Sequence, residues 1–480
     1  MATGLEWTSA TELAKLIRRG KLSPVELVDA LLARIDRVNP SVNAYCTVSS
    51  DEARAAARDA EAAVRAGDEL GLLHGVPYSL KDLTPTRGIR TTMGSMIFEH
   101  NVPDADGLLV QRMRAAGAIL LGKTNTPEFG CKPLTDNRLF GATRNPWALD
   151  RSPGGSSGGA AAAVAAGLGP LAQGSDLAAS IRQPAAWSGV VGFKPSQGRV
   201  PRVPNASGWS GLSVDGPIAR TVADAAMMFA AIAGPDPRDP LSLPATGEEW
   251  EALVDGDDNG SGPAAALRNL RIAWTPDLGG AVPVDPSVAA ICEEAARAFE
   301  AFDCDLEEDA PQIGEIAQPF VLLNAGLRQT TLGKYLDEWR DKMDPILVRR
   351  LEVAGDATAV DVAQAEVART AYHQRLCAFF ERYDLLVLPT AVTPPLPLDA
   401  RFPIQVGGQT LQQPFDMLLP TYAFNFSNFP AISVPAGWTE DGLPVGLQLV
   451  GGWQKDALVL QAAAAFEQAR PWADRLPPLA

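Results

Sequence analysis

The sequence predicts an α/β fold: a single large domain in which helices cover both faces of a central mixed β-sheet, with an added helical cap. Two observations support this class. Helical segments and short apolar strands alternate along most of the chain, as they do where helices join the strands of a sheet. The late apolar runs 384–389 and 445–450 are too short for helices and are typical of buried strands.

Helices are expected where apolar residues recur at helical spacing between capping residues. Ser9 and Ser23 are candidate N-caps, Pro24 occupies a first helical position, and Gly67 ends the third helix. The segment after Gly159 is almost entirely alanine and valine, so its helix must be packed tightly in the interior. The expected helices are 8–19, 23–38, 51–66, 107–116, 160–166, 220–233, 286–302 and 455–470.

Strands are expected in short apolar runs between turn residues. These strands are 76–80, 118–121, 271–275, 384–389, 431–435 and 445–450, with a further strand after residue 302. Segment 235–269 is rich in turn residues and is expected to be a surface excursion, and 311–383 a mostly helical cap. One structural domain would then contain four parts: N-terminal helices (1–70), a core with the site (71–234), the excursion and cap (235–383), and the last core strands (384–480).

Composition limits the classes of partner. The chain has 480 residues, of which 46% are hydrophobic and 20% charged, as in globular proteins. Its net charge of −16 argues against nucleic acid, because phosphate binding needs a basic surface. Five scattered cysteines favour reduced thiols over a disulfide framework. Because neither an apolar leader nor an apolar run of about 18 residues is visible, we expect a cytoplasmic protein without a membrane span.

Three familiar site patterns fail on their physical requirements. Residues 117–124 match the phosphate-loop pattern G-x-x-x-x-G-K-[ST], but the residues between the glycines form an apolar strand whose N–H groups belong to the sheet. The turn at 154–159 matches G-x-S-x-G, yet the only histidine after it, His373, lies in a helical stretch, which disfavours a Ser-His-Asp triad. The histidines and cysteines lack zinc-ligand spacing, so no metal is expected.

The sequence offers instead a lysine at the end of a strand and two serine-bearing turns, 154–159 and 175–180. Burial lowers the pKa of a lysine because it disfavours the charged form, and the residues before Lys81 are apolar. A neutral lysine can accept the proton of one serine hydroxyl, which can accept that of a second serine. Taken alone, a lysine in this position is more often a surface lysine, here paired with Asp82.

These features occur within a long, ordered set of motifs, among them HGVPYSLKDL, SPGGSSGGAAAAVAAGL, GSDLAASIRQPA and GVVGFKPSQGRV. With these motifs the chain resembles the amidase signature family over nearly its whole length. The resemblance implies that family's fold and its Ser–Ser–Lys triad. Ser180 would be the nucleophile, Ser156 a bridging serine preceded by a cis peptide bond, and Lys81 the general base. It implies no metal and no organic cofactor.

The resemblance also assigns residues around the triad. The oxyanion hole would consist of four backbone N–H groups, those of Leu177, Ala178, Ala179 and Ser180, which stabilise the charge that develops on the carbonyl oxygen. Three residues would have supporting roles: Ser157 would support either Lys81 or its own turn, and Asp176 and Arg182 would hold the second turn by hydrogen bonds. The segment that corresponds to a wall of the family's acyl site is Phe129, Gly130 and Cys131.

The sequence departs from the family pattern at two places. Ala178 and Ala179 stand where two glycines usually precede the nucleophile. A left-handed backbone would be strained at either alanine, which could alter the oxyanion hole or the substrate scope. Asn428 stands where a C-terminal motif normally has glycine, and asparagine copies the backbone of glycine best.

The resemblance implies an amidase that hydrolyses C–N bonds through an acyl-enzyme on Ser180. Apolar side chains are frequent in the cap and late loops, which favours apolar or aryl amides, anilides or carbamates (urethanes) as small-molecule substrates. They are Phe320, Leu322, Tyr335, Trp339, Phe415, Met417, Tyr422, Phe424 and Phe426. The resemblance also suggests a homodimer.

Two other functions remain open at this point. The glutaminase subunit of a tRNA-dependent amidotransferase shares the same signature and acts only with partner subunits. A catalytically impaired, amide-binding homologue is the other alternative, because Ala178 and Ala179 replace the usual glycines.

Overall fold

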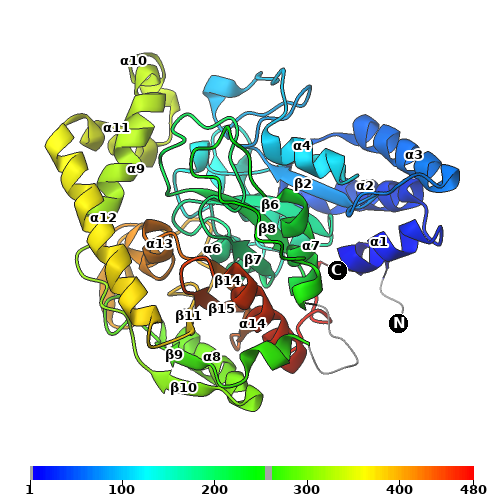
Figure 1. Ribbon diagram of the computed structural model, residues 1–480. Helices are drawn as coiled ribbons and strands as arrows, with labels where there is room; N and C mark the ends of the chain where they lie inside the picture. The colour runs from blue at the N-terminus through cyan, green and yellow to red at the C-terminus, as the bar shows by residue number, and fades with distance from the viewer. Residues whose placement is uncertain (1–3, 255–261, 480) are drawn as a thin grey trace.

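A computed structural model describes residues 4–254 and 262–479. One mixed sheet of 11 strands runs through the molecule in the order β1-β3-β2-β6-β8-β7-β14-β15-β11-β9-β10. Helices cover both of its faces (Figure 1). Successive strand residues face opposite cores: Leu171 belongs to a hydrophobic cluster with residues of α7 (Val222–Ile232) and α14 (Asp456–Ala469), whereas Ala172 belongs to one with residues of α5 (Gly158–Ala165) and α6 (Arg182–Ser188). The predicted α/β class and helix-covered mixed sheet are therefore confirmed.

The strands of the large sheet include all those expected from the sequence. They are β1 (Tyr45–Val48), β2 (Pro77–Lys81), β3 (Ile119–Thr124), β6 (Leu171–Asp176), β7 (Val191–Lys194), β8 (Val214–Ala219), β9 (Arg271–Trp274), β10 (Asp305–Glu308), β11 (Leu385–Pro389), β14 (Ala431–Trp438) and β15 (Pro444–Gly451). Two small sheets pair β4 (Asp136–Asn137) with β5 (Gly141–Ala142) and β12 (Ile404–Val406) with β13 (Gln409–Leu411).

Four strands of the large sheet were not expected from the sequence, β1, β6, β7 and β8, and neither were the strands of the two small sheets. In β6 and β8, glycine, proline and aspartate interrupt the apolar pattern, although both strands lie inside the sheet. One expectation is corrected here. Ser175 and Asp176 are the last residues of β6 and pair with β8, so only the residues after Asp176 form a turn.

The individually expected helices form near their expected positions, whereas α6 and α13 (Leu419–Phe426) were not expected. The helices are α1 (Ala10–Arg18), α2 (Pro24–Val42), α3 (Ser50–Ala66), α4 (Leu108–Ala115), α5 (Gly158–Ala165), α6 (Arg182–Ser188), α7 (Val222–Ile232), α8 (Pro286–Ala296), α9 (Ala317–Leu332), α10 (Leu336–Trp339), α11 (Pro345–Gly355), α12 (Ala359–Phe380), α13 (Leu419–Phe426) and α14 (Asp456–Ala469). Ser9 and Ser23 cap α1 and α2 through their side chains, as expected. Every residue of α5 is buried, which its alanine content requires.

Segment 311–383 is mostly helical. Its long helices α9, α11 and α12 lie together on one side of the molecule (Figure 1), where α9 contacts both of the others. Met343, Leu347 and Leu351 of this cap form a cluster with Cys131 from the core. The cap therefore packs directly against the segment that the sequence assigned to the wall of the site.

The excursion expected at 235–269 is partly anchored. Residues 255–261 lie outside the described residues, and the remainder contains two short 3-10 helices, Ala252–Val254 and Pro263–Leu267. Trp250 packs edge-on against Phe229 of α7, with 4.9 Å between ring centroids.

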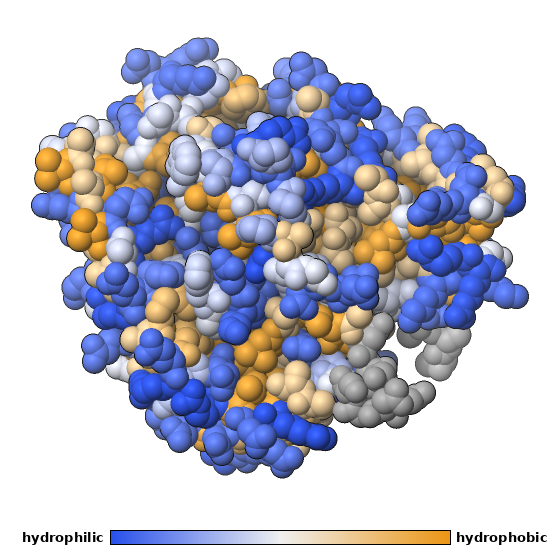
Figure 2. Space-filling model, in the orientation of Figure 1, coloured by the Kyte–Doolittle hydropathy of each residue, from blue (hydrophilic) through white to orange (hydrophobic). Residues whose placement is uncertain are grey.

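Hydrophilic residues cover most of the face in Figure 2. Within 4–254 and 262–479, none of the helices combines the length and hydrophobicity needed to span a bilayer.

Candidate active site

Lys81 is the last residue of β2, a strand of the large sheet whose residues are all buried. Its Nζ donates hydrogen bonds to three serine hydroxyls: Ser156 at 2.7 Å, Ser157 at 2.9 Å and Ser175 at 3.1 Å. The surface pairing with Asp82 does not form, because the side chain of Asp82 accepts hydrogen bonds from Thr92 instead. The strand thus brings the lysine to both serine-bearing segments.

The environment of Lys81 favours its neutral form. Burial lowers its pKa to about 7, because the ammonium group loses its hydration, while the carboxylates of Asp215 and Asp176 act in the opposite direction. At neutral pH a substantial fraction of such a lysine is unprotonated. Lys81 can therefore accept a proton from a hydroxyl that it contacts.

The turn with Ser156 and Ser157 depends on close backbone packing. The peptide bond between Gly155 and Ser156 is cis. A Cβ atom on Gly155 would lie 2.8 Å from the carbonyl carbon of Pro133, so a side chain does not fit there. The hydroxyl of Thr135 donates to Gly154 O at 2.8 Å and accepts from Gly158 N at 3.2 Å. These contacts fix the turn immediately before α5.

Ser180 lies in the loop between β6 and α6, where it is half-buried. Its carbonyl accepts a hydrogen bond of 3.1 Å from Ser157 N, which joins the two serine-bearing segments. Within the described residues, the N–H groups of 177–180 donate no hydrogen bond to the protein, so they are free to bind an oxygen. Neither Ala178 nor Ala179 has a positive φ, and the loop forms without the backbone strain that alanine could cause.

A buried ion pair between Asp176 and Arg182 holds the loop that contains Ser180. Both side chains are fully buried, and Arg182 donates to the two carboxylate oxygens at 2.9 and 3.0 Å. Arg182 also donates to Thr421 O and to Gln448 Oε1, and Asp176 accepts from Ile181 N. Burial alone would raise the pKa of Asp176, but the guanidinium lowers it to about 2, so the carboxylate stays charged.

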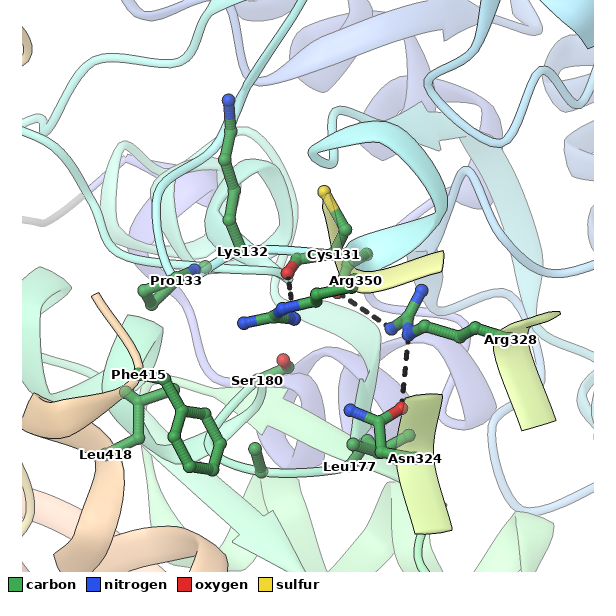
Figure 3. A pocket seen from close by; sticks show the side chains of 13 residues that line it. Cys131, Lys132, Pro133, Leu177, Ser180, Asn324, Arg328, Arg350, Phe415 and Leu418 are labelled. Atoms are coloured by element: carbon green, nitrogen blue, oxygen red, sulfur yellow. Dashed lines mark hydrogen bonds between the residues drawn. The ribbon is translucent and has the colours of Figure 1, made fainter. Parts of the chain in front are cut away.

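Ser180 lines a pocket between its loop and the cap (Figure 3). One side is apolar, and the other is polar and is supplied mainly by helices α9 and α11 of the cap. The apolar residues include Leu177, Ala178, Phe415 and Leu418, and the polar ones include Asn324, Arg328 and Arg350 of the cap and Lys132 of the core. Among the residues expected to form the acyl wall, Gly130 and Cys131 line the pocket, and Phe129 contacts it through its carbonyl, which accepts from Arg328 at 3.0 Å.

Sequence reasoning missed the three polar cap residues Asn324, Arg328 and Arg350. They lie 144 to 170 residues after Ser180. They are on helices where charged side chains normally face solvent, so no local signal distinguishes them. Of the aromatic and apolar residues noted in the sequence, Phe415 reaches the pocket, whereas Phe320 of α9 and Tyr422, Phe424 and Phe426 of α13 are packed in one core cluster.

The patterns rejected in the sequence have other roles. Residues 119–124 form β3, which pairs with β1 and β2, and Lys123 donates to Thr84 O and to Thr86 Oγ1. His373 lies on α12, where Nδ1 contacts Ser427 O at 2.9 Å. In the described part of the chain, no group of three or more His, Cys, Asp or Glu side chains is arranged to hold a metal ion.

This fold and site define an amidase. The Amidase family model matches residues 26–460, and the chain belongs to this family. A curated acylamidase of Rhodococcus erythropolis is 42% identical, with 98% of each chain covered. The A subunit of the glutamyl-tRNA(Gln) amidotransferase of Thermosynechococcus vestitus is 34% identical, covering 98% of this chain and 99% of its own.

Solved structures agree with the family. A bacterial aryl acylamidase of the amidase signature family superposes with a TM-score of 0.91 at 32% identity, covering 98% of both chains. A 6-aminohexanoate cyclic dimer hydrolase superposes with a TM-score of 0.88 at 32% identity, covering 99% of both. The protein is accordingly an amidohydrolase of the amidase signature family.

Proposed function

We propose that the protein hydrolyses the C–N bond of aryl or apolar amides, including anilides, through an acyl-enzyme on Ser180. The observation that carries this proposal is the buried contact between Lys81 and Ser156, 2.7 Å long, beside a pocket lined by Ser180. A lysine whose pKa is near neutrality and which contacts a serine is suited to deprotonate a nucleophile through that serine.

In the proposed reaction, Ser180 Oγ attacks the amide carbonyl and its proton passes through Ser156 Oγ to Lys81 Nζ. The N–H groups of 177–180 stabilise the negative oxygen of the tetrahedral intermediate. The intermediate collapses with cleavage of the C–N bond, and the amine leaves with the proton returned through Ser156. Water then attacks the ester on Ser180 by the same relay, which releases the carboxylic acid and restores the serine.

The apolar side of the pocket supports an apolar or aryl group on the substrate. Phe415 and Leu418 offer an aromatic ring and a branched side chain beside Ser180. An acylamidase and an aryl acylamidase are among the similar proteins, which supports anilides as the first substrates to test. An aryl carbamate presents the same carbonyl bonded to nitrogen, so we include urethane hydrolysis in the proposal.

The glutaminase subunit of an amidotransferase is the second candidate. Several curated amidotransferase subunits of this kind are 34–37% identical over nearly the whole chain, which supports it. The pocket, however, includes no carboxylate among its lining residues in the described part of the chain. The ammonium group of glutamine would lack a charged partner there, and this favours an amide without an ammonium group.

The proposal is tested by turnover of 4-nitroacetanilide and by labelling with a fluorophosphonate. We expect Ser180→Ala to lose labelling, and Ser180→Ala, Ser156→Ala and Lys81→Ala each to lower kcat/KM by more than about 10³-fold. Ser287→Ala, an exposed serine on α8, is the matched control. Turnover by Ser180→Ala near the wild-type rate would refute the acyl-enzyme. Glutamine turnover exceeding that of every anilide would favour the amidotransferase function.

A further inference from the structure

A histidine and a cysteine contact each other on the long cap helix α12 (Figure 1). His373 and Cys377 are four residues apart, so the helix places them one turn above the other on the same side. Cys377 Sγ lies 3.4 Å from His373 Nε2. Both side chains are half-buried, so solutes can reach them from solvent. The pair forms a second cluster of reactive side chains, apart from the residues of the candidate active site.

The imidazole of His373 is held in one orientation and one tautomer. Its Nδ1 lies 2.9 Å from Ser427 O, and because a carbonyl oxygen only accepts, Nδ1 must carry the proton. Its ring packs against Phe429 and Trp453, with ring centroids 5.4 and 6.2 Å away. The lone pair of Nε2 is therefore directed toward Cys377. Histidines that bind metals are oriented in this way, with the other ring N–H donated to a carbonyl.

The spacing of the sulfur and the nitrogen fits one tetrahedral ion. A Zn²⁺ ion bound to a thiolate at about 2.3 Å and to an imidazole at about 2.05 Å needs these ligand atoms about 3.5 Å apart. The contact between Cys377 and His373 has almost this length. The local charge is also suitable for a cation, because the exposed Glu381 follows one turn later and the carbonyl end of α12 carries partial negative charge.

The other four cysteines have different surroundings. Cys131 and Cys292 are buried, so a hydrated ion does not reach their thiols. Cys304 and Cys46 are half-buried, and their sulfur atoms lie 3.0 and 3.4 Å from backbone carbonyl oxygens. Cys377 differs from all four in combining access from solvent with a nitrogen ligand at its sulfur.

We propose that His373 and Cys377 bind a thiophilic divalent cation, Zn²⁺ above all, with water molecules in the remaining tetrahedral positions. A thiolate and an imidazole are the ligands that such an ion prefers. The site is independent of the amidase reaction proposed above. With two protein ligands instead of the four of a structural zinc site, we expect a Kd between about 1 and 100 µM.

Binding must displace one proton. Burial and the carboxylate of Glu381 raise the pKa of the Cys377 thiol, so the sulfur is protonated in the metal-free protein. The ion replaces this proton, which leaves to solvent, while His373 binds through the nitrogen that is already unprotonated. Each Zn²⁺ bound should therefore release about one proton, measurable in a weakly buffered solution.

The test is a Co²⁺ titration of the reduced full-length protein, followed by displacement with Zn²⁺. Tetrahedral cobalt with a thiolate ligand gives visible d–d bands and a sulfur-to-metal charge-transfer band, which we expect to saturate at one ion per chain. Cys377→Ser should abolish the charge-transfer band. His373→Asn keeps an N–H group near Ser427 O but removes Nε2, and it should weaken binding at least about tenfold. Excess Zn²⁺, at 100 times its Kd, should raise the Tm of the wild type by about 2–3 °C.

Cys304→Ser and His100→Asn are the matched controls, because they remove a half-buried thiol and an exposed imidazole elsewhere in the chain. Both should bind Co²⁺ as the wild type does. Absence of the charge-transfer band up to about 1 mM Co²⁺ would overturn the proposal, and so would a band that persists in Cys377→Ser. Cobalt held only by surface carboxylates would show no such band and would count against the site. Because turnover is not the readout, the result does not depend on the proposed amidase function.

Discussion

Lys81 Nζ lies 3.1 Å from the hydroxyl of Ser175, which extends from the neighbouring strand of the sheet. Strands β2 and β6 are parallel, so their ends meet at one edge and bring these two side chains together. Ser175 also lines a second pocket with Arg202 and Asp215. Lys81 thus contacts Ser156 and Ser157, which lie in the turn before α5. It also contacts the hydroxyl of Ser175 in β6, and Ser175 lines a separate pocket.

The pH dependence of the reaction should follow Lys81. Because the proposed base must be neutral and its pKa is about 7, kcat/KM for a neutral anilide should rise through about pH 7 and level off above it. Asp215 raises the pKa of Lys81, so Asp215→Asn should move this limb to lower pH. Asp104→Asn, an exposed carboxylate, serves as the control. A limb that stays in place in Asp215→Asn would contradict the electrostatic role of Asp215.

Ser175 should contribute less to the rate than the bridging serine. Ser175→Ala removes one hydrogen bond from Lys81 and leaves those to Ser156 and Ser157. One such bond is worth about 1 kcal/mol, so kcat should fall by about fivefold, against more than about 10³-fold for Ser156→Ala. Steady-state kinetics of the two variants show which of the two serines contributes more to the rate. Equal losses would place Ser175 in the relay itself.

The buried ion pair between Asp176 and Arg182 should matter chiefly for the stability of the fold. Arg182→Met leaves Asp176 buried without its counter-charge, and loss of one partner of such a pair costs about 3–5 kcal/mol. We expect a large drop in the urea midpoint measured by circular dichroism. Arg297→Met removes an exposed pair with Glu293 and should leave the midpoint unchanged. A small effect of Arg182→Met would contradict the stabilising role of its ion pair with Asp176.

Local patterns in the sequence predicted much of this fold because they coincide with the physical requirements of its elements. The capped helices at Ser9 and Ser23 and the buried alanine helix α5 follow from caps and composition. Strands β6 and β8 were missed because glycine, proline and aspartate interrupt their apolar pattern, and the pairing that makes them strands comes from segments distant in the sequence.

The candidate site, like the fold, could be predicted only in part from the sequence. Lys81 could be singled out because it ends an apolar strand, and resemblance to the family supplied Ser156 and Ser180. Ser175 was named only as the first residue of a turn, and its contact with Lys81 depends on the pairing of β2 with β6. Arg328 and Arg350 reach the pocket only through the packing of cap helices on the core, and no local pattern encodes that packing.

Gly130 provides a steric test of the geometry around Ser156. Its φ is +65°, and a Cβ atom there would lie 3.0 Å from Ser156 Oγ and 3.2 Å from a methyl group of Leu83. Gly130→Ala should therefore strain the backbone and displace the serine, lowering kcat for a neutral anilide by at least about tenfold. Gly355→Ala is the matched control, since nothing lies within 4 Å of its Cβ position at the end of α11. If both variants retain the wild-type kcat, the position of Ser156 does not limit the reaction.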